Sequence, residues 1–374
     1  MRTQLTPIGE LLDFYNGKAP NQVDDGEFVL YGSNGQIGRS KSFNHEDAII
    51  LGRVGAYCGS VEVCPNKFWA SDNTIVVKTK NGYDLRYMYY RLLSSPLRSY
   101  AGGAAQPLLT QTILRGIKLQ VIAELSKQKR IASILSAYDD LIENNRRRIQ
   151  LLEQAARLLY KEWFVHLRFP GHENVKIKDG VPEGWNPSCI ADIGEVITGK
   201  TPSKKNESFY GDDIPFIKTP DMHGNFVVIQ TEESLSEKGA NSQSNKTLPP
   251  RSILVSCIGT VGAVAFNGPI AQTNQQINTI VPKYESLRYW TFFMAKDLKP
   301  LLEGIGGGAT MANVNKSKFS SIKIIIPSSL MLEQFASVVA PQFDQIEKLA
   351  LMNLRLAHAR DLLLPRLMNG EVAV

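Results

Sequence analysis

"LSKQKRIASILSAYDDLIENNRRRIQLLEQAARLLYKEWF", residues 125–164, is the stretch of sequence that decides the fold. Apolar side chains recur in it every three or four residues, a spacing that places them on one face of a helix. The steps alternate between three and four with one stutter, which is typical of a coiled coil. The seam consists of Ile131, Ile134, Tyr138, Leu141, Asn145, Ile149, Leu152, Ala156, Leu159 and Trp163. We therefore expect one long amphipathic helix with charged outer faces.

A second seam of the same kind closes the chain. It consists of Phe335, Val339, Gln342, Ile346, Leu349, Asn353, Leu356, Arg360, Leu363 and Leu367. Proline cannot donate a helix hydrogen bond, so we expect the second helix to break or start at Pro341. The counterpart of Pro341 in the first copy is Ser136, which puts the start of an uninterrupted coil near Tyr138.

Polar residues within the seams help to decide whether the two helices are buried in a core or exposed. One possibility is a helix pair buried in a single globular core, and the other is an exposed antiparallel pair. Asn145, Asn353 and Arg360 lie in the seams, and such residues fix the register of coiled coils at a cost in stability. The pattern favours an exposed pair that acts as a spacer.

Short motifs recur in the same order in both halves of the chain, which indicates an internal duplication. Ile8-Gly9-Glu10 recurs as Ile193-Gly194-Glu195, 185 residues later, and "LGRVGAY" recurs as "CIGTVGAV" with Gly52 and Gly259 207 residues apart. Further matches at an offset of 205 are Gly103-Ala104 with Gly308-Ala309, Ile117 with Ile322, Asp139 with Asp344, and Leu158 with Leu363. The growth of the offset by 22 predicts an insertion in the second copy, within residues 221–250.

Each copy is expected to combine short strands and glycine turns with the long helix that closes it. The predicted fold is α+β, with two globular α/β domains separated by an antiparallel pair of long coiled-coil helices and related by pseudo-twofold symmetry. The predicted boundaries are 1–123 for the first domain, 124–169 for its helix, 170–327 for the second domain, entered through a linker at 166–185, and 328–374 for the second helix.

Composition narrows the class of protein. The 374 residues carry a net charge of +6, with 43% hydrophobic and 21% charged residues, as in an ordinary globular protein that has room for two or three domains. The four cysteines form no CxxC pair and the five histidines are scattered, so we expect no metal site and free thiols in the cytoplasm. The basic excess is compatible with a polyanionic partner.

Residues 194–201, "GEVITGKT", match the phosphate-binding loop pattern G-x-x-x-x-G-K-[ST]. A working loop of this kind needs a helix directly after it, because the helix N-terminus holds the phosphates. Thr201 is instead followed by "PSKKN", which has no helical period, and in the first copy Gly9 and Gly17-Lys18 stand too far apart for the motif. These observations argue against a nucleotide-binding role, and a P-loop NTPase that uses Gly194–Thr201 is kept only as an alternative. For Lys18 and Lys200 we prefer contacts with DNA phosphates.

Two globular domains on a spacer suit a ligand with two separated sites on one lattice, such as duplex DNA. Base edges and phosphates are contacted by Arg, Lys, Asn, Gln, Ser and Thr, and the glycine loops of this chain are rich in these residues. The candidate DNA-binding residues are Lys18, Ser33, Asn34, Gln36, Arg39, Lys41, Arg53, Asn73, Gln106, Thr110, Lys200, Thr260, Thr273, Asn274, Gln275, Asn313, Asn315 and Lys316. Thr310 belongs to the same glycine-rich stretch as Asn313.

These features together resemble the DNA specificity subunit of Type I restriction–modification systems, over essentially the whole chain. "FVLYGSNGQIG", "GRVGAYCGSV" and "FWASDNT" look like target-recognition motifs, the segment 125–164 looks like the central conserved helix, and "VPEGW" looks like the opening of the second recognition domain. The helix segment is the most specific of these matches.

The resemblance implies a non-catalytic chain in which each globular domain is a target recognition domain for one half of a bipartite, asymmetric DNA target. It implies that the two helices set the unread gap and dock two methyltransferase subunits, with two restriction subunits as further partners. S-adenosylmethionine, ATP and Mg²⁺ would then bind to the partners. A coiled-coil scaffold without a DNA function is the third alternative, besides the specificity subunit and the NTPase.

Overall fold

The computed structural model describes residues 3–20, 22–80, 82–103, 106–306 and 313–372. The chain forms two compact units, called here unit 1 (Met1–Glu143 and Arg355–Val374) and unit 2 (Asn144–Leu354). Two long helices, α4 (Leu125–Tyr160) and α11 (Ser329–Met368), each contribute residues to both units. Each unit therefore contains its own segment of the helix pair.

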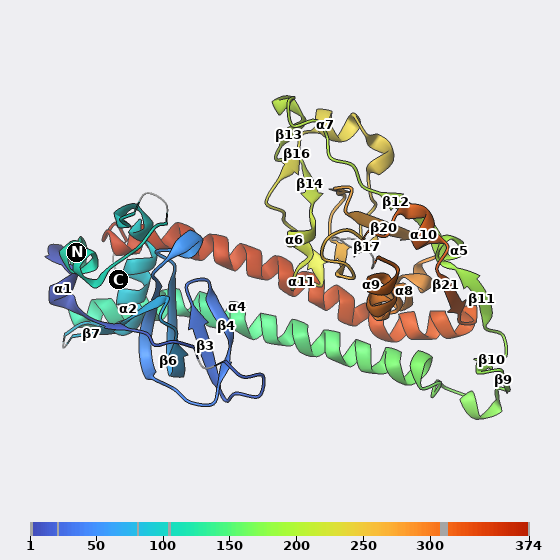
Figure 1. Ribbon diagram of the computed structural model, residues 1–374, viewed down its shortest axis with the longest axis horizontal. Coiled ribbons are helices and arrows are strands. Elements are labelled where there is room, and N and C mark those ends of the chain that lie inside the picture. The colour runs from blue at the N-terminus through green and yellow to red at the C-terminus, as the bar shows by residue number, and fades with distance from the viewer. Residues whose placement is uncertain (1–2, 21, 81, 104–105, 307–312, 373–374) are drawn as a thin grey trace. The chain divides into compact units, whose positions relative to one another are not determined.

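Unit 1 is built on a six-stranded sheet in the order β2-β7-β5-β6-β3-β4, beside a separate ribbon of β1 and β8 (Figure 1). Its strands are β1 (Thr3–Pro7), β2 (Leu12–Asn16), β3 (Phe28–Gly32), β4 (Gly35–Ser40), β5 (His45–Gly52), β6 (Val61–Ala70), β7 (Thr74–Thr79) and β8 (Lys118–Ile122). Its helices, besides the long pair, are α1 (Ile8–Leu11), η1 (Gly55–Tyr57), α2 (Leu85–Leu93), η2 (Leu97–Tyr100) and α3 (Gln111–Gly116).

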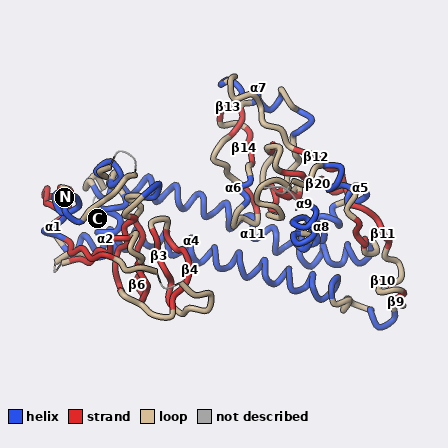
Figure 2. Tube along the Cα trace, in the orientation of Figure 1, coloured by secondary structure: helices blue, strands red, loops and turns tan. Residues whose placement is uncertain are grey.

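Unit 2 has a five-stranded sheet, a four-stranded sheet and two ribbons, with helices between them (Figure 2). Its strands are β9 (Ile177–Lys178), β10 (Val181–Pro182), β11 (Asn186–Cys189), β12 (Gly194–Thr198), β13 (Tyr210–Gly211), β14 (Ile214–Ile217), β15 (Val227–Val228), β16 (Ser234–Leu235), β17 (Ile253–Ser256), β18 (Val264–Asn267), β19 (Gln272–Thr273), β20 (Ile277–Pro282) and β21 (Lys323–Ile326). Its helices are α5 (Ile190–Ile193), α6 (Thr219–Met222), α7 (Glu237–Asn241), α8 (Glu285–Asp297), α9 (Lys299–Gly306) and α10 (Lys316–Ser320), with short turns η3 (Lys161–Val165, a π-helix), η4 (His172–Asn174), η5 (Glu207–Phe209) and η6 (Ser244–Lys246).

The predicted duplication is confirmed by strand order. Unit 1 runs β2-β7-β5-β6 and unit 2 runs β12-β20-β17-β18, with all three pairings antiparallel in each unit. The parallel pair β3-β6 of unit 1 corresponds to the parallel pair β14-β19 of unit 2. Each unit also carries an antiparallel ribbon between the strand before its first short α-helix and the strand before its closing helix, β1-β8 and β11-β21.

The predicted pairing of Ile117 with Ile322 is confirmed, because their carbonyls accept from the equivalent amides of Ile8 and Ile190, whereas the pairing of Ile8 with Ile193 is three residues off. Ile8 opens α1 whereas Ile193 closes the equivalent helix α5, so the two are not counterparts. Strand pairing makes Phe14, opposite Val77, the counterpart of Val196, opposite Ile280, at an offset of 182. The error arose because an apolar residue followed by glycine occurs close by in each copy, and a short motif cannot distinguish these registers.

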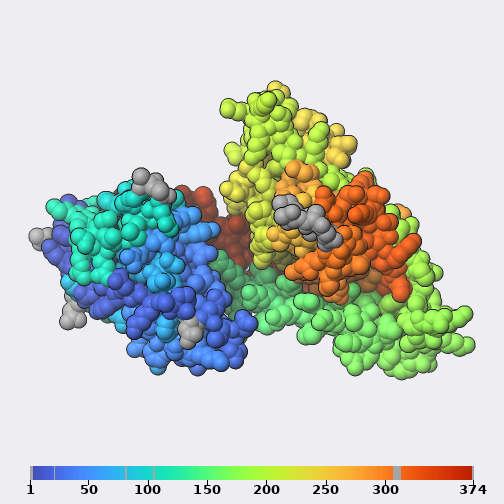
Figure 3. All heavy atoms as spheres, in the orientation of Figure 1, coloured from blue at the N-terminus to red at the C-terminus, as the bar shows by residue number. Residues whose placement is uncertain are grey.

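The insertion in the second copy lies mainly within the predicted range. Lys18 and Lys200 donate to the carbonyls of Ala70 and Thr273, whose parallel partners are Tyr31 of β3 and Ile217 of β14, so Tyr31 and Ile217 are counterparts. From these residues to the equivalent Ile49 and Ile253 there are 18 positions in unit 1 and 36 in unit 2. Most of the extra chain therefore follows Ile217, and it includes β16 and α7, which lie in the part of unit 2 that projects in yellow-green and yellow (Figure 3).

The prediction that the second helix breaks at Pro341 is wrong. Helix α11 runs through Pro341 and Pro365 without interruption, and both prolines are exposed. An interior proline costs about 3 kcal/mol, and buried residues on both sides of Pro341 offset this cost. Phe335, Val339 and Phe343 are each at most 5% exposed and belong to the core of unit 2.

The seam of α4 also differs from the predicted one at two positions. Leu141 is 36% exposed, whereas Ile142 is 6% exposed and takes its place, and the fully buried Leu135 takes the place of the half-buried Ile134. A seam from Ile131 through Leu135, Tyr138 and Ile142 alternates steps of four and three, and it removes the stutter. Ile134, Leu363, Ile149, Leu152 and Leu159 are half-buried against the cores, while Ile346 and Leu349 are buried and Leu356 is half-buried.

The helix pair is part of each core and not a bare connector. In unit 1, Leu135 of α4 and Leu367 of α11 are buried in one cluster with Tyr87 of α2. In unit 2, Trp163 packs on Phe335 with ring centroids 5.8 Å apart, and Asn145 donates to Asn353 at 2.9 Å. These two contacts show that the helices run antiparallel. No helix in the described ranges is long and apolar enough to cross a membrane.

Candidate nucleic-acid interface

A glycine–lysine turn follows the first sheet strand in each unit. The Lys18 amide donates to the Ala70 carbonyl at 3.0 Å, and the Lys200 amide donates to the Thr273 carbonyl at 2.9 Å. Each preceding glycine allows this close approach, because a Cβ at Gly17 would lie 1.8 Å from a carbonyl oxygen of the neighbouring turn. The equivalent distance at Gly199 is 2.2 Å. Both lysine side chains are exposed as a result.

Hydrogen bonds join several polar loops of unit 1 into one surface. Ser33 Oγ donates to the Asn73 carbonyl at 2.6 Å, and the Arg53 amide donates to the same carbonyl at 2.9 Å. The Leu109 amide donates to the Arg53 carbonyl at 2.9 Å, and Gln111 Nε2 donates to Asn16 Oδ1 at 3.0 Å beside the glycine–lysine turn. We call this surface the unit 1 loop cluster, and it consists of residues 16–18, 33–34, 53–55, 71–73 and 106–111.

The unit 1 loop cluster contains seven of the predicted DNA-binding residues. One of them, Ser33, joins two of its loops through the hydrogen bond to the Asn73 carbonyl. Lys18, Asn34, Asn73 and Gln106 are exposed, and Arg53 and Thr110 are half-buried. Thr110 Oγ1 accepts from the Ile113 amide at 3.2 Å and caps α3. The exposed members therefore supply amide and ammonium groups, which are the side chains that contact bases and phosphates.

Three further candidates of unit 1 are occupied elsewhere. Gln36 Nε2 donates to the Tyr31 hydroxyl at 3.4 Å. Arg39 Nη1 donates to the Glu27 carbonyl at 3.1 Å, and Lys41 lies 3.8 Å from Asp25. All three are exposed on or after β4, outside the unit 1 loop cluster.

Unit 2 repeats the arrangement on equivalent elements. The Cys257 amide donates to the Gln276 carbonyl at 2.8 Å, and the Val314 amide donates to the Cys257 carbonyl at 2.9 Å. Thr201 Oγ1 donates to Gln275 Oε1 at 2.7 Å, which ties the glycine–lysine turn to the same surface. We call this surface the unit 2 loop cluster, and it consists of residues 200–201, 257–260, 273–276 and 313–316.

Exposure divides the predicted residues of unit 2. Those that are exposed are Lys200, Thr260, Gln275, Asn313, Asn315 and Lys316. Thr273 is 0% exposed and Asn274 is 8% exposed, so the structure argues against DNA contact by these two side chains. Asn274 instead shapes its turn, because its Oδ1 accepts from the Gln276 amide at 3.1 Å and its Nδ2 donates to Gln276 Oε1 at 3.0 Å.

Two details complete the comparison with the predicted residues. Asn315 Oδ1 accepts from the Lys318 amide at 2.9 Å and caps α10, as Thr110 caps α3 in unit 1. Thr310, Gly308-Ala309 and Ala104 lie outside the described residues.

The hydrogen bonds also correct one pairing between the copies. The amide and carbonyl of Arg53 make the same backbone bonds as those of Cys257, so Cys257 is its counterpart and Thr260 is not. Gly55 and Gly259, with φ of 73° and 78°, are equivalent at the same offset of 204. Gln276 is therefore the counterpart of Asn73, and sequence motifs missed it because their register was three residues off.

The geometry of residues 194–201 excludes a phosphate-binding loop. Gly194–Thr198 is strand β12, and the chain from Gly199 to Asn206 contains no helix. The element that follows is the three-residue turn η5 at Glu207. No helix begins within the described residues directly after the glycine–lysine turn, so the arrangement that a phosphate-binding loop needs is missing there.

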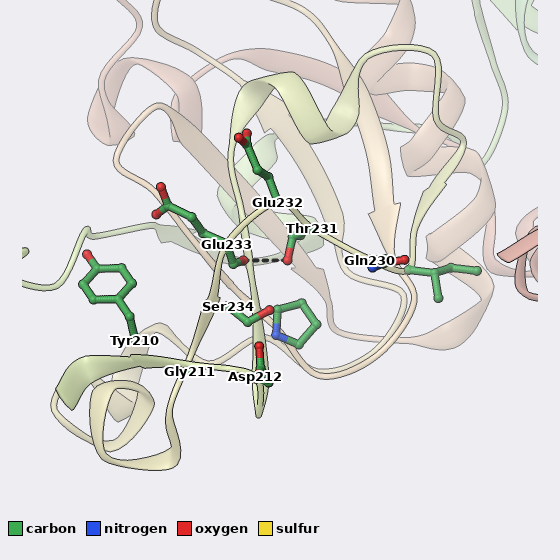
Figure 4. Close-up of a pocket in the computed structure, with 10 residues that line it drawn as sticks. Tyr210, Gly211, Asp212, Gln230, Thr231, Glu232, Glu233 and Ser234 are labelled. Carbon is green, nitrogen blue, oxygen red and sulfur yellow. Dashed lines mark hydrogen bonds between the residues drawn. The ribbon is translucent and has the colours of Figure 1, made fainter. Parts of the chain in front are cut away.

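A hollow of about 580 Å³ lies in the four-stranded sheet of unit 2, and its lining is acidic (Figure 4). Asp212, Glu232 and Glu233 line it, and Thr231 Oγ1 donates to the Glu233 carbonyl at 2.6 Å. A hydrogen bond from Lys218 lowers the pKa of the Glu233 carboxyl. Such a lining repels phosphate, so this hollow is not part of the candidate interface.

Within the described ranges, no group of three His, Cys, Asp or Glu side chains lies close enough together to hold a metal ion.

Comparisons with known proteins agree with the duplicated fold. The family model described as the Type I restriction modification DNA specificity domain matches residues 4–154 and again residues 182–339. The HindI specificity subunit of Haemophilus influenzae is 33% identical over 354 residues, which span 76% of this chain and 77% of that protein. The MjaIX specificity subunit of Methanocaldococcus jannaschii is 25% identical and spans 99% of this chain and 90% of its own length.

A solved structure gives the same result for the fold. The crystal structure of a Type I restriction–modification S subunit from M. genitalium superposes with a TM-score of 0.63 at 15% identity, covering 98% of this chain and 96% of that chain. Fold and loops thus define a tandem DNA specificity domain protein, in which one domain type occurs twice. The chain belongs to the family of Type I restriction–modification specificity subunits.

Proposed function

We propose that this chain is the subunit that reads DNA sequence in a Type I restriction–modification complex. Each unit reads one half of a bipartite, asymmetric duplex target through its loop cluster. The observation that carries the proposal is the repetition of the loop cluster, with an exposed glycine–lysine turn, on equivalent sheets of two units that both match the DNA specificity domain.

The lysine turns suit contact with the DNA backbone. Lys18 and Lys200 are exposed, occupy equivalent places, and are held by the same backbone hydrogen bond. Phosphates are present at every target sequence, so a residue kept in both copies is well placed to bind them. The exposed amides of Asn73 and Gln275 on the neighbouring turns are suited to base edges.

The helix pair is the second part of the proposal. Helices α4 and α11 contribute to both units, and the Asn145–Asn353 hydrogen bond specifies their register. We propose that the pair sets the unread gap between the two half-sites and docks two methyltransferase subunits, with restriction subunits as further partners. The chain itself is non-catalytic and cytoplasmic, and S-adenosylmethionine, ATP and Mg²⁺ bind to the partners.

Salt-dependent DNA binding tests the role of the lysines. The chain is assembled with its methyltransferase subunits, and binding to a target duplex is measured between about 50 and 200 mM salt for K18A, K200A and the double variant. Each substitution is expected to lower the slope of log K against log salt by about 1. K41A is the matched control, because Lys41 is exposed but lies beside Asp25 outside the cluster.

The result also separates the alternatives. Equal slopes for K200A and K41A would refute the assignment of the lysines to phosphates. A complex whose DNA binding is untouched by all four variants would favour a coiled-coil scaffold without a DNA function.

A further inference from the structure

Arg53 and Cys257 occupy the same place in the two units but differ in chemistry. The amide of each donates to the carbonyl of Asn73 or Gln276, at 2.9 and 2.8 Å, and each of these lies three residues after the carbonyl that accepts from the lysine amide. The carbonyl of each accepts from an amide of the next loop at 2.9 Å. The backbone is therefore the same, while one unit carries a guanidinium and the other a thiol that is 1% exposed.

One donor of the Arg53 side chain, Nε, is buried without a hydrogen-bond acceptor among the described residues, although the residue as a whole is half-exposed. A buried N–H without an acceptor is costly, and in native proteins it calls for a functional explanation. Arg53 is also the only arginine of either loop cluster.

The surroundings of Arg53 combine a rigid base with an open face. A Cβ at Gly52 would lie 2.4 Å from the Tyr57 carbonyl oxygen, so the chain just before Arg53 is tightly packed. Gly55 has a φ of 73°, and no atom lies within 4 Å of the place where its Cβ would be. Arg53 therefore lies on a tightly packed backbone, two residues before a glycine at which a ligand can approach the chain closely.

Comparison of the two copies distinguishes residues that bind DNA phosphates from residues that read bases. Both units meet the same phosphate backbone, so a residue that binds phosphate is useful in both copies, as Lys18 and Lys200 are. The two half-sites differ in sequence, so a residue that reads bases is expected to differ between equivalent positions. The pair Arg53 and Cys257 belongs to the second kind.

We propose that Arg53 is a specificity-determining residue of unit 1, which recognises a guanine in the half-site that unit 1 reads and has no counterpart in unit 2. Guanine presents O6 and N7 as two acceptors in the major groove, and they match the fork of a guanidinium. This inference rests on the proposed function.

The test compares R53K and R53Q with R39K in the assembled methyltransferase complex. N6-methyladenine is mapped in a methylation-free host, and binding is measured to duplexes with each base pair of each half-site exchanged in turn. R39K is the matched control, because Arg39 is an exposed arginine of unit 1 that donates to the Glu27 carbonyl outside the cluster. Thermal melting checks that each variant is folded.

We expect R53K and R53Q to lose discrimination at one guanine in one half-site by about 5- to 150-fold, and to leave the other half-site unchanged. R39K is expected to keep the wild-type motif. A uniform loss of affinity for all duplexes, with a lower salt slope, would overturn the proposal by making Arg53 a phosphate contact. An unchanged motif, or loss at both half-sites, would overturn it as well.

The experiment also distinguishes failure of the proposed function from failure of this inference. If the proposed function is wrong, the wild-type complex shows no bipartite motif. If only this inference is wrong, the wild-type motif is bipartite and does not change when Arg53 is replaced.

Discussion

The Asn145–Asn353 pair allows a quantitative test of how the helices are held in register. Asn145 is 1% exposed and Asn353 is half-buried, and Asn145 Nδ2 donates to Asn353 Oδ1 at 2.9 Å within the core segment of unit 2. N353L leaves the buried Asn145 amide without its partner, and a buried polar group left unsatisfied costs about 1–3 kcal/mol, so this variant should destabilise the chain by that amount. N145L leaves Asn353, which water can reach, and should destabilise the chain by less.

The double variant should behave differently. Two leucines at facing seam positions pack as in an ordinary coiled coil, so no unsatisfied amide remains. We expect N145L/N353L to recover most of the stability lost in the single variants, with a coupling free energy of about 1 kcal/mol or more.

The assay is equilibrium urea unfolding of the full chain, followed by far-ultraviolet circular dichroism. N144L is the matched control, since Asn144 is exposed on the same helix, and it should change the free energy of unfolding by less than about 0.5 kcal/mol. Additive effects of N145L and N353L, with coupling within about 0.3 kcal/mol of zero, would refute the argument that the hydrogen bond specifies the register.

Two further predictions concern unit 2. G199A should destabilise it by more than about 2 kcal/mol, because the new Cβ would lie 2.2 Å from the Asn274 carbonyl oxygen, whereas G304A, where nothing lies within 4 Å, should be neutral or slightly stabilising in thermal melting. Burial raises the pKa of the Cys257 thiol to about 11, so the folded chain keeps this proton longer than the unfolded chain. The resulting stabilisation is complete below about pH 9 and is lost as the pH rises toward 11, so C257A should unfold with a smaller loss of melting temperature between pH 8 and 10.5. An alkaline loss of equal size in C257A would contradict the assignment to this thiol.

Periodicity predicted the large elements well because it depends on many residues at once. Both long helices are present, and most of their seam residues are buried or half-buried. The choice between the neighbours Leu141 and Ile142 was wrong, since both are apolar and only packing against the partner helix distinguishes them. Pro341 was misjudged because a local rule ignores the core contacts that hold the helix together on both sides.

The candidate site was predictable only as a set of loops. Glycine and polar residues marked the turns, but the sequence does not show which side chains of a turn are accessible. Thr273 is fully buried, whereas Gln275, two residues later, is exposed. Two of the short motifs, at Ile8 and at Gly52, were aligned three residues out of register, whereas Ile117 was aligned correctly with Ile322. The equivalence of Arg53 with Cys257 required the backbone hydrogen bonds.

The central claim is that two units read two separate half-sites of one DNA target. The most direct measurement expresses this chain with its methyltransferase subunit in a methylation-free host and maps N6-methyladenine by single-molecule sequencing. The account predicts one motif with two short specified halves around an unread gap of constant length. A continuous short motif, or no motif from an active methyltransferase, would contradict it.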